Sequence, residues 1–219
     1  MNDMIFLKSE SSFTFFFLSI LSAFFLLFEG CAGRGVAPKE SDNICNIFFK
    51  NRQWYLDADK ASRKWGIPIS VLMAIMYQES KYEADARPPR TTCLFIFPGS
   101  RPSSAYGYSQ AIDSTWKKYI RETENWGADR DDFGDSIDFI GWYCYRSHKR
   151  CKISVKDTYS LYLAYHEGQG GFLQKTYGNK KYLKKTALRV KNKARIYASQ
   201  LAACRKKLKD AGGCCLWPF

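Results

Sequence analysis

A glutamate at the end of an apolar helical pattern is the residue in this sequence best suited to acid–base chemistry. Glu79 follows Ile75 by four residues and Leu72 by seven, so a helix over residues 66–80 would place its carboxyl group on the apolar stripe. A carboxyl group there loses hydration, which disfavours its charged form and raises its pKa. A general acid that works near neutral pH needs this property. Taken alone, the pattern also fits a helix-end glutamate turned towards solvent.

Two segments further along the chain could supply partners for this glutamate. The first is Tyr106-Gly107-Tyr108-Ser109-Gln110, and the second is Ala164-Tyr165-His166-Glu167-Gly168. Each is a weak signal by itself, because tyrosines pack in many protein cores and glutamines are common in loops. Only as members of one ordered set, after Gln78-Glu79-Ser80, do they indicate a site.

The order and spacing of the three segments resemble the lytic transglycosylases of the soluble-lytic-transglycosylase type, which share a lysozyme-like fold with goose-type lysozyme. Enzymes of that family show Glu-Ser at a helix end, then Gly-x-x-Gln, then Ala-Tyr-Asn-x-Gly. The resemblance covers roughly residues 45–204. It implies an enzyme that acts on peptidoglycan glycan strands, and we expect no cofactor.

The resemblance also implies roles for individual residues. Glu79 would be the single catalytic acid and base, and Ser80 would help to fix its carboxyl group or the sugar. Gln110, in the segment that begins with Tyr106, would contact an N-acetyl sugar, and Tyr165 would hydrogen-bond the Glu79 carboxyl group. One position departs from the family, since His166 stands where the usual residue is Asn. A structural histidine that holds the same turn is favoured there over a catalytic one.

The implied reaction cleaves the β-1,4 bond between N-acetylmuramic acid and N-acetylglucosamine and forms a 1,6-anhydro ring. A hydrolase of that bond would need a second carboxylate, about 5 Å away or about 6.5–9.5 Å away, whereas the transglycosylase does not. No motif ties any of the candidate second carboxylates to catalysis: Glu83, Asp85, Asp113 and Glu167. The non-hydrolytic reaction is therefore favoured, with a goose-type muramidase and a non-catalytic peptidoglycan-binding envelope protein as alternatives.

The N-terminal sequence predicts export. Residues 13–28 form an apolar run that is somewhat short for a membrane span and typical of a signal-peptide core. Cys31 follows this run as in a bacterial lipoprotein signal, although Phe28 and Glu29 depart from the usual Leu and small residue. A lipidated Cys31, an uncleaved anchor and a cleaved signal peptide stay open. All three place the chain at the periplasmic face of the envelope, and the first two tether it to a membrane.

The charge is concentrated in one segment. Of the 34 basic residues, 13 lie between Lys175 and Lys209, where there is no acidic residue, and the other 21 balance the 21 acidic ones. This segment could bind anionic envelope polymers or a phospholipid surface. The favoured alternative is the solvated face of a domain-closing helix. Nucleic-acid binding is disfavoured by the export segment and the cysteines. The sequence identifies no protein partner.

Eight cysteines fit an oxidising compartment. Cys45 opens the first expected helix and Cys204 lies on the apolar seam of the last, so a bond between them would join the ends of the domain. Cys144 and Cys151 form a second, weaker candidate pair. A zinc site is disfavoured, because the chain has only two histidines and no paired CxxC motifs.

Helical spacing throughout the body predicts an all-α fold. Helices are expected over residues 46–65, 66–80, 113–124, 131–147, 155–165 and 183–208, the fifth ended by the glycines from Gly168 to Gly171. Four prolines indicate a long surface loop over residues 85–104. We expect a signal peptide or anchor over residues 1–30, a tether over 31–44, the catalytic domain over 45–210 and a tail over 211–219.

Overall fold

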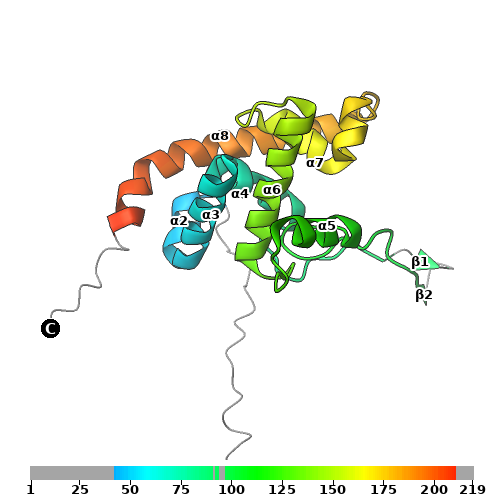
Figure 1. The fold of residues 1–219 in the computed structure, drawn as a ribbon, viewed down its shortest axis with the longest axis horizontal. Coiled ribbons are helices and arrows are strands. Elements are labelled where there is room, and N and C mark those ends of the chain that lie inside the picture. Colours follow the sequence, from blue (N-terminus) through cyan, green and yellow to red (C-terminus); the bar gives the residue numbers. More distant parts are fainter. Residues whose placement is uncertain (1–41, 91, 94–96, 211–219) are drawn as a thin grey trace, which may run out of the picture. The chain divides into compact units, whose positions relative to one another are not determined.

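A computed structural model of the protein describes residues 42–90, 92–93 and 97–210. This part of the chain is mainly helical, which confirms the predicted fold class (Figure 1). Its helices are α2 (Ile44–Lys50), α3 (Arg52–Trp65), α4 (Ile69–Ser80), α5 (Asp113–Thr123), α6 (Phe133–Cys151), α7 (Thr158–Leu173) and α8 (Lys181–Asp210). A two-residue antiparallel pair, β1 (Thr92–Cys93) with β2 (Phe97–Pro98), lies in the loop between α4 and α5.

The expected signal or anchor segment, Cys31 and the C-terminal tail lie outside the described residues. Within the residues that are described, no helix is both long enough and apolar enough to cross a membrane.

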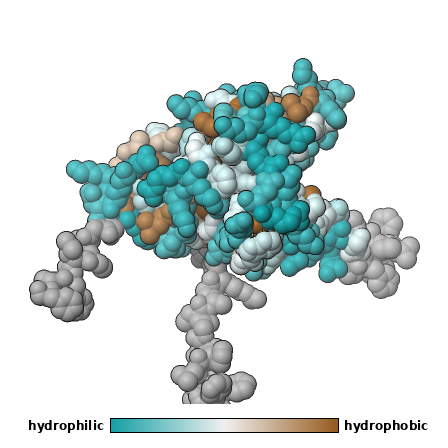
Figure 2. Space-filling view, viewed as in Figure 1, coloured by the Kyte–Doolittle hydropathy of each residue, from teal (hydrophilic) through white to brown (hydrophobic). Residues whose placement is uncertain are grey.

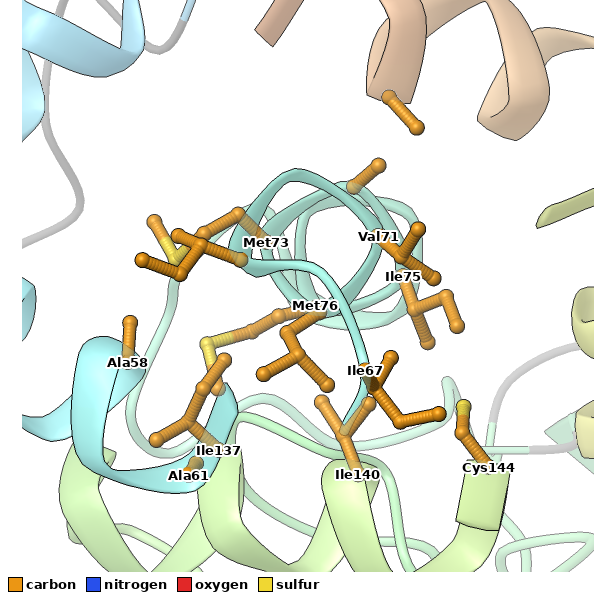
Figure 3. Packing of buried hydrophobic residues seen from close by; sticks show 14 of the residues in the cluster. Ala58, Ala61, Ile67, Val71, Met73, Ile75, Met76, Ile137, Ile140 and Cys144 are labelled. Atoms are coloured by element: carbon orange, nitrogen blue, oxygen red, sulfur yellow. The ribbon is translucent and has the colours of Figure 1, made fainter. Parts of the chain in front are cut away.

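Helix α4 forms the centre of the domain. Every residue from Ile69 to Met76 is buried, because apolar side chains cover all sides of the helix and neighbours pack around it. Helices α3, α6 and α8 contact it. Figure 3 shows Met76 between α4 and the Ile137 and Ile140 side chains of α6. The last turn of α4, which carries Glu79, is therefore held by a rigid core.

Helix α8 packs along the domain by the predicted seam. All eight seam residues are buried: Leu183, Ala187, Val190, Ala194, Tyr197, Leu201, Cys204 and Leu208. The basic side chains of α8 lie outside this seam, together with polar residues and a few exposed apolar ones such as Leu188 and Ile196. The view of the molecule in Figure 2 is mostly hydrophilic, with separate apolar patches. The Cys45–Cys204 disulfide is present and joins α2 to α8, which confirms that prediction.

The second cysteine pair was predicted wrongly. Cys144 and Cys151 are both free thiols, one buried and one partly buried. Both lie on α6, seven residues apart, which corresponds to about 10 Å along a helix axis. A disulfide needs Cα atoms within about 7 Å, so a continuous helix keeps the two sulfur atoms apart.

Two helix boundaries also differ from the prediction. The expected helix over residues 46–65 is interrupted at Asn51, whose backbone is non-helical with φ −128° and ψ 75°. Its N–H still bonds the Ile47 carbonyl, so α2 ends and α3 begins without a loop. Helix α7 does not end before the glycines. It kinks at Gly168, with φ 76° and ψ 157°, and continues to Leu173.

Candidate active site

Glu79 lies in the last turn of α4, just before a tight turn in the backbone. The two residues after Ser80, Lys81 and Tyr82, have positive φ angles of 57° and 67°. The buried Ser80 hydroxyl holds this turn, since it donates to the Met76 carbonyl at 3.3 Å and accepts from the Tyr82 N–H at 3.2 Å. The Ser80 side chain therefore bonds backbone groups on both sides of Glu79, and the expected contact with the carboxyl group or a sugar is not among its hydrogen bonds.

Tyr82 anchors the same turn to the core. Its ring is fully buried, its hydroxyl donates to the Met73 carbonyl at 3.0 Å, and it lies 3.2 Å from the Tyr197 hydroxyl of α8. This arrangement fixes the backbone that follows Glu79, so the carboxyl group has a defined position relative to α8.

The surroundings of Glu79 change its acidity in the direction that the sequence predicted. Part of the residue is open to solvent. Burial of the carboxyl group nevertheless raises its pKa to about 7, against the lowering effects of a hydrogen bond from Tyr162 and of the Lys81 charge. A carboxylic acid with this pKa is substantially protonated near neutral pH and can donate or accept a proton.

The hydrogen bond to Glu79 comes from a different tyrosine than expected. Tyr165 does not bond the carboxyl group, because its hydroxyl donates to the Ser109 carbonyl at 2.7 Å. Tyr162, one helical turn earlier on α7, bonds Glu79, and burial together with the Glu79 charge raises the pKa of its own hydroxyl strongly. Both tyrosines lie on the face of α7 that is turned towards Glu79, and the rotation of the helix selects Tyr162.

The segment Tyr106–Gln110 is built against the backbone near Arg130. A Cβ atom at Gly107 would lie 2.0 Å from the Arg130 carbonyl oxygen, so only glycine fits there, and its φ of 75° also favours glycine. The Tyr108 N–H bonds that same carbonyl at 3.1 Å. Because Tyr165 bonds the carbonyl of Ser109, this segment is connected directly to α7.

Gln110 and Tyr106 lie on this segment with defined contacts. The Gln110 side-chain amide donates to the carbonyls of Ala86 and Gly107 at 2.8 and 2.9 Å, which leaves its side-chain oxygen available as an acceptor. The Tyr106 hydroxyl donates to Asp131 at 2.8 Å, and the Arg87 guanidinium lies 4.1 Å from the centre of its ring.

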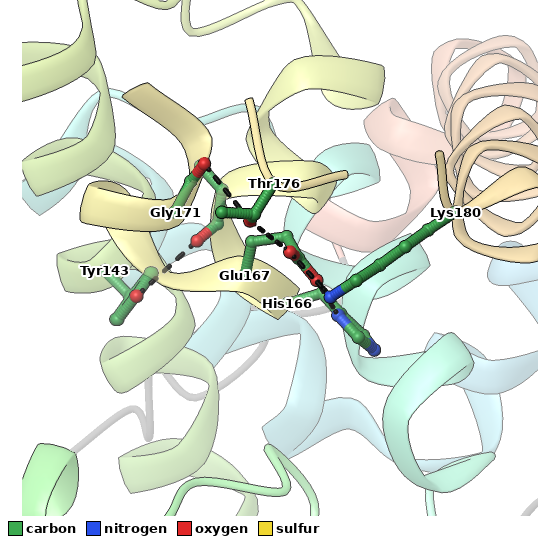
Figure 4. Close-up of polar contacts among 7 residues, drawn as sticks. Tyr143, His166, Glu167, Gly171, Thr176 and Lys180 are labelled. Carbon is green, nitrogen blue, oxygen red and sulfur yellow. Dashed lines mark hydrogen bonds and ion pairs between the residues drawn. The ribbon is translucent and has the colours of Figure 1, made fainter. Parts of the chain in front are cut away.

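His166 is half-exposed and belongs to a polar cluster with Glu167 (Figure 4). The buried Glu167 side chain contacts the Lys180 ammonium at 2.8 Å and His166 Nδ1 at 3.1 Å, and it accepts a hydrogen bond from Thr176. Burial acts to raise the pKa of Glu167, but the hydrogen bonds from Lys180, Thr176 and His166 outweigh it and hold the pKa at about 2. This cluster ties α7 to the start of α8.

The structure shows the surroundings of the four candidate second carboxylates. Asp113 pairs with Arg130 at 2.8 Å, Glu167 is held in the cluster above, and Glu83 and Asp85 are exposed. In the described part of the chain, no acidic side chain is among the groups that shift the pKa of Glu79. The described residues also contain no group of three His, Cys, Asp or Glu residues arranged to hold a metal ion.

Sequence reasoning missed Tyr162 and Lys81 as neighbours of Glu79. A signal for Tyr162 was present, since it precedes Tyr165 by three residues and must share its face of a helix. Lys81 gave no such signal, because its position depends on the positive φ angles that follow α4.

A protein-family model described as "Transglycosylase SLT domain" matches residues 19–204 of the chain. No curated protein sequence matches this chain.

Proposed function

This chain belongs to the transglycosylase SLT-domain family, and we propose that it cleaves peptidoglycan without water, leaving a 1,6-anhydromuramic acid end. Membership of the family indicates lytic transglycosylase activity on peptidoglycan in general. The proposal adds the bond, the product and the residues: cleavage between N-acetylmuramic acid and N-acetylglucosamine, with Glu79 as the single acid and base.

One observation carries this proposal. Glu79 has a pKa of about 7 and a tyrosine hydroxyl bonded to it, and no other carboxylate contributes to that pKa among the residues described. Hydrolysis by two carboxylates requires a pair at a suitable separation. A lone glutamate that can both give and take a proton fits the reaction that needs only one.

In the first step, protonated Glu79 donates its proton to the glycosidic oxygen. The bond between that oxygen and C1 of the muramic acid breaks, the N-acetylglucosamine leaves with a new hydroxyl group, and C1 acquires oxocarbenium character. Lys81 and the Tyr162 hydroxyl stabilise the carboxylate that remains, since both favour the charged form of Glu79.

In the second step, the ionised Glu79 takes the proton from the 6-hydroxyl group of the same sugar. The 6-oxygen then bonds C1 and closes the 1,6-anhydro ring, which restores protonated Glu79. Because the attacking oxygen is tethered to the sugar that it attacks, proximity replaces a positioned water molecule. Gln110 supports this geometry with its side-chain oxygen, which can accept a hydrogen bond from an N-acetyl group.

Mass spectrometry of the muropeptides released from purified sacculi tests the proposal. The wild type should release products that end in anhydromuramic acid, each lighter by one water than the product of hydrolysis. Glu79→Gln should lower the rate of release by at least about a hundredfold, because a general acid contributes about that much or more. Glu83→Gln is the matched control, since Glu83 is an exposed glutamate four residues later, and it should keep the wild-type rate.

The alternatives give different outcomes in the same experiment. If the wild type releases products that end in reducing muramic acid, the protein is a muramidase and not a transglycosylase. A wild type that releases nothing beyond what Glu79→Gln releases would leave only a peptidoglycan-binding role.

The proposal includes the place of action. The apolar run at residues 13–28 and Cys31 support export to the periplasmic face of the envelope with an N-terminal membrane tether. Intact-mass measurement of the protein from membranes distinguishes a lipid on Cys31 from an uncleaved anchor.

A further inference from the structure

A cavity of about 590 Å³ lies over the N-terminus of α4, between α4, the start of α7 and the middle of α8. A neighbouring cavity of about 240 Å³ shares Pro68, Ser70 and Ala198 with it, so the two form one groove along α8. Ser70 is in the first turn of α4 and Glu79 in the last, about 14 Å apart along the helix axis. The groove is therefore separate from the candidate active site.

The groove is lined by positive charge. Lys156, Lys191 and Arg195 line the larger cavity, and no Asp or Glu lines either cavity. None of these three side chains forms an ion pair with another described residue. The nearest carboxyl group in the sequence, Asp157, caps α7 by accepting the Ser160 N–H. An anionic ligand would therefore meet three cations that have no anion of their own.

Two mostly buried residues, Ser70 and Thr158, carry hydroxyl groups and line the same cavity. Ser70 is only 7% exposed and Thr158 only 5%. Neither side chain hydrogen-bonds any residue that the structure describes. Neither hydroxyl oxygen is among the buried side-chain atoms that lack a partner, so both are accessible from the cavity that their residues line. A hydroxyl group with no protein partner is free to donate to a ligand there.

The backbone of α4 adds two more donors. Pro68 caps the helix without a side-chain hydrogen bond. Within the described chain, no backbone carbonyl accepts the amide hydrogens of Ile69 and Ser70. The N-terminus of a helix attracts negative charge, and free amide groups there bind phosphate oxygens well.

Asn192 in the larger cavity and Ser62 and Arg205 in the smaller one are the other polar residues of the groove, and Arg205 is paired with Asp59 at 3.7 Å. The rest of its walls are apolar. Pro68, Val71, Ala194 and Ala198 line it, and Leu188 stands beside it with half of its surface exposed. A free phosphate ion would leave these side chains in water, whereas a phosphate attached to an apolar body would cover them. Basic helices with exposed apolar residues are also typical of segments that lie on anionic lipid.

We propose that this groove binds the phosphate headgroup of an anionic phospholipid and holds α8 against a membrane surface. Ser70, Thr158 and the first amide groups of α4 donate to the phosphate oxygens. Lys156, Lys191 and Arg195 balance the charge, and Leu188 contacts the apolar part of the lipid next to the headgroup.

Vesicle titration of the full chain tests the site. The affinity is measured for phosphatidylcholine vesicles with and without phosphatidylglycerol. The apolar run at residues 13–28 is common to every measurement, so the gain in affinity from phosphatidylglycerol reports the headgroup site. Lys191→Gln/Arg195→Gln should reduce that gain by about 25-fold, at about fivefold for each cation. Ser70→Ala, which alters no charge, should reduce it by about fivefold.

The matched control is Lys206→Gln/Lys207→Gln, which removes the same charge from exposed positions of α8 that line neither cavity. This control should change the gain by less than about twofold. An equal loss in the control would show unspecific attraction and overturn the site. Binding of soluble glycerol phosphate as tight as vesicle binding would overturn the lipid as its ligand. Variants that bind vesicles normally but bind sacculi less would assign the groove to an acidic part of peptidoglycan instead.

Muropeptide release from sacculi is measured for the same variants and should stay at the wild-type rate, because the groove is remote from Glu79. A fall in release that parallels the loss of vesicle binding would show that the variants disturb the domain as a whole, and the headgroup site would then be rejected.

Discussion

Two glutamates of this protein show how strongly surroundings decide what a side chain can do. Burial dominates at Glu79 and raises its pKa to about 7, whereas three hydrogen-bond donors around Glu167 hold its pKa at about 2. Glu167 is therefore always ionised at physiological pH and serves to connect α7 with α8. Of these two residues, Glu79 is the one with the acidity of a proton donor and acceptor near neutral pH.

The raised pKa of Glu79 predicts a pH-dependent cost to stability. The unfolded chain loses this proton near pH 4.5 and the folded chain near pH 7. Between these values the folded state binds more protons, so this residue makes the free energy of unfolding fall as the pH rises. Glu79→Gln removes this pH dependence. The free energy of unfolding of the variant, taken relative to that of the wild type, should therefore increase by about 1–3 kcal/mol between about pH 5 and about pH 8. Urea unfolding at both pH values measures this gain, and a constant difference would contradict the prediction.

The two tyrosines of α7 should have different effects on the pH dependence of activity. Tyr162 lowers the pKa of Glu79 through a hydrogen bond, so Tyr162→Phe should move the alkaline limb of the pH–rate profile to higher pH. Tyr165→Phe should leave the limb in place and cost about 1–3 kcal/mol of stability, because it leaves the Ser109 carbonyl without its donor. Equal shifts in both variants would show that the hydrogen bond is not specific to Tyr162.

The family resemblance indicated Tyr165 as the partner of Glu79, and the residue that bonds it is the neighbouring Tyr162 on the same helix face. Tyr162 and Tyr165 are three residues apart, so any α-helix over this segment places them on the same face. Which hydroxyl reaches the carboxyl group depends on how α7 is rotated and placed relative to α4. The orientation of α7 follows from its packing against other helices, and a local sequence pattern carries no information about that packing.

At the scale of elements, prediction succeeded where one physical pattern dominated. The seam of α8 repeats for eight residues without interruption, so all of its buried positions except Thr186 were predictable. The break at Asn51 and the continuation of α7 through Gly168 were not, because each depends on tertiary contacts that override local preference. The connection of the Tyr106–Gln110 segment to Arg130 likewise lies between parts of the chain that no short motif relates.

Because of that connection, the structure should not tolerate a side chain at Gly107. Gly107→Ala forces a Cβ atom to within 2.0 Å of the Arg130 carbonyl oxygen, at a positive φ angle as well. The backbone must move, so the free energy of unfolding should fall by more than about 3 kcal/mol. Gly127→Ala is the control, since nothing lies within 4 Å of the new Cβ atom there, and its unfolding should stay within about 1 kcal/mol of the wild type. Thermal unfolding of both variants measures the difference.

At the scale of the whole domain, the Cys45–Cys204 bond joins residues that are 159 positions apart in the sequence. A cross-link over so long a loop restricts the unfolded chain strongly. The double variant Cys45→Ala/Cys204→Ala should lose about 3–5 kcal/mol of stability. Cys151→Ala, which removes a partly buried free thiol, should lose less than about 1 kcal/mol. Urea unfolding under oxidising conditions measures the stability of both variants. When a reductant is added, the wild type should become only as stable as the double variant.

The same bond determines the stage of synthesis at which the domain can be completed. Its two cysteines lie in the first and last described helices, so the ring closes only after the chain has been made as far as Cys204. Helix α4 also receives its α8 partner last, and with it the contact between Tyr82 and Tyr197 that fixes the turn after Glu79. A nascent or truncated chain that lacks α8 therefore carries Glu79 without its support. Wall-cleaving activity should first appear in a chain that is complete through Cys204.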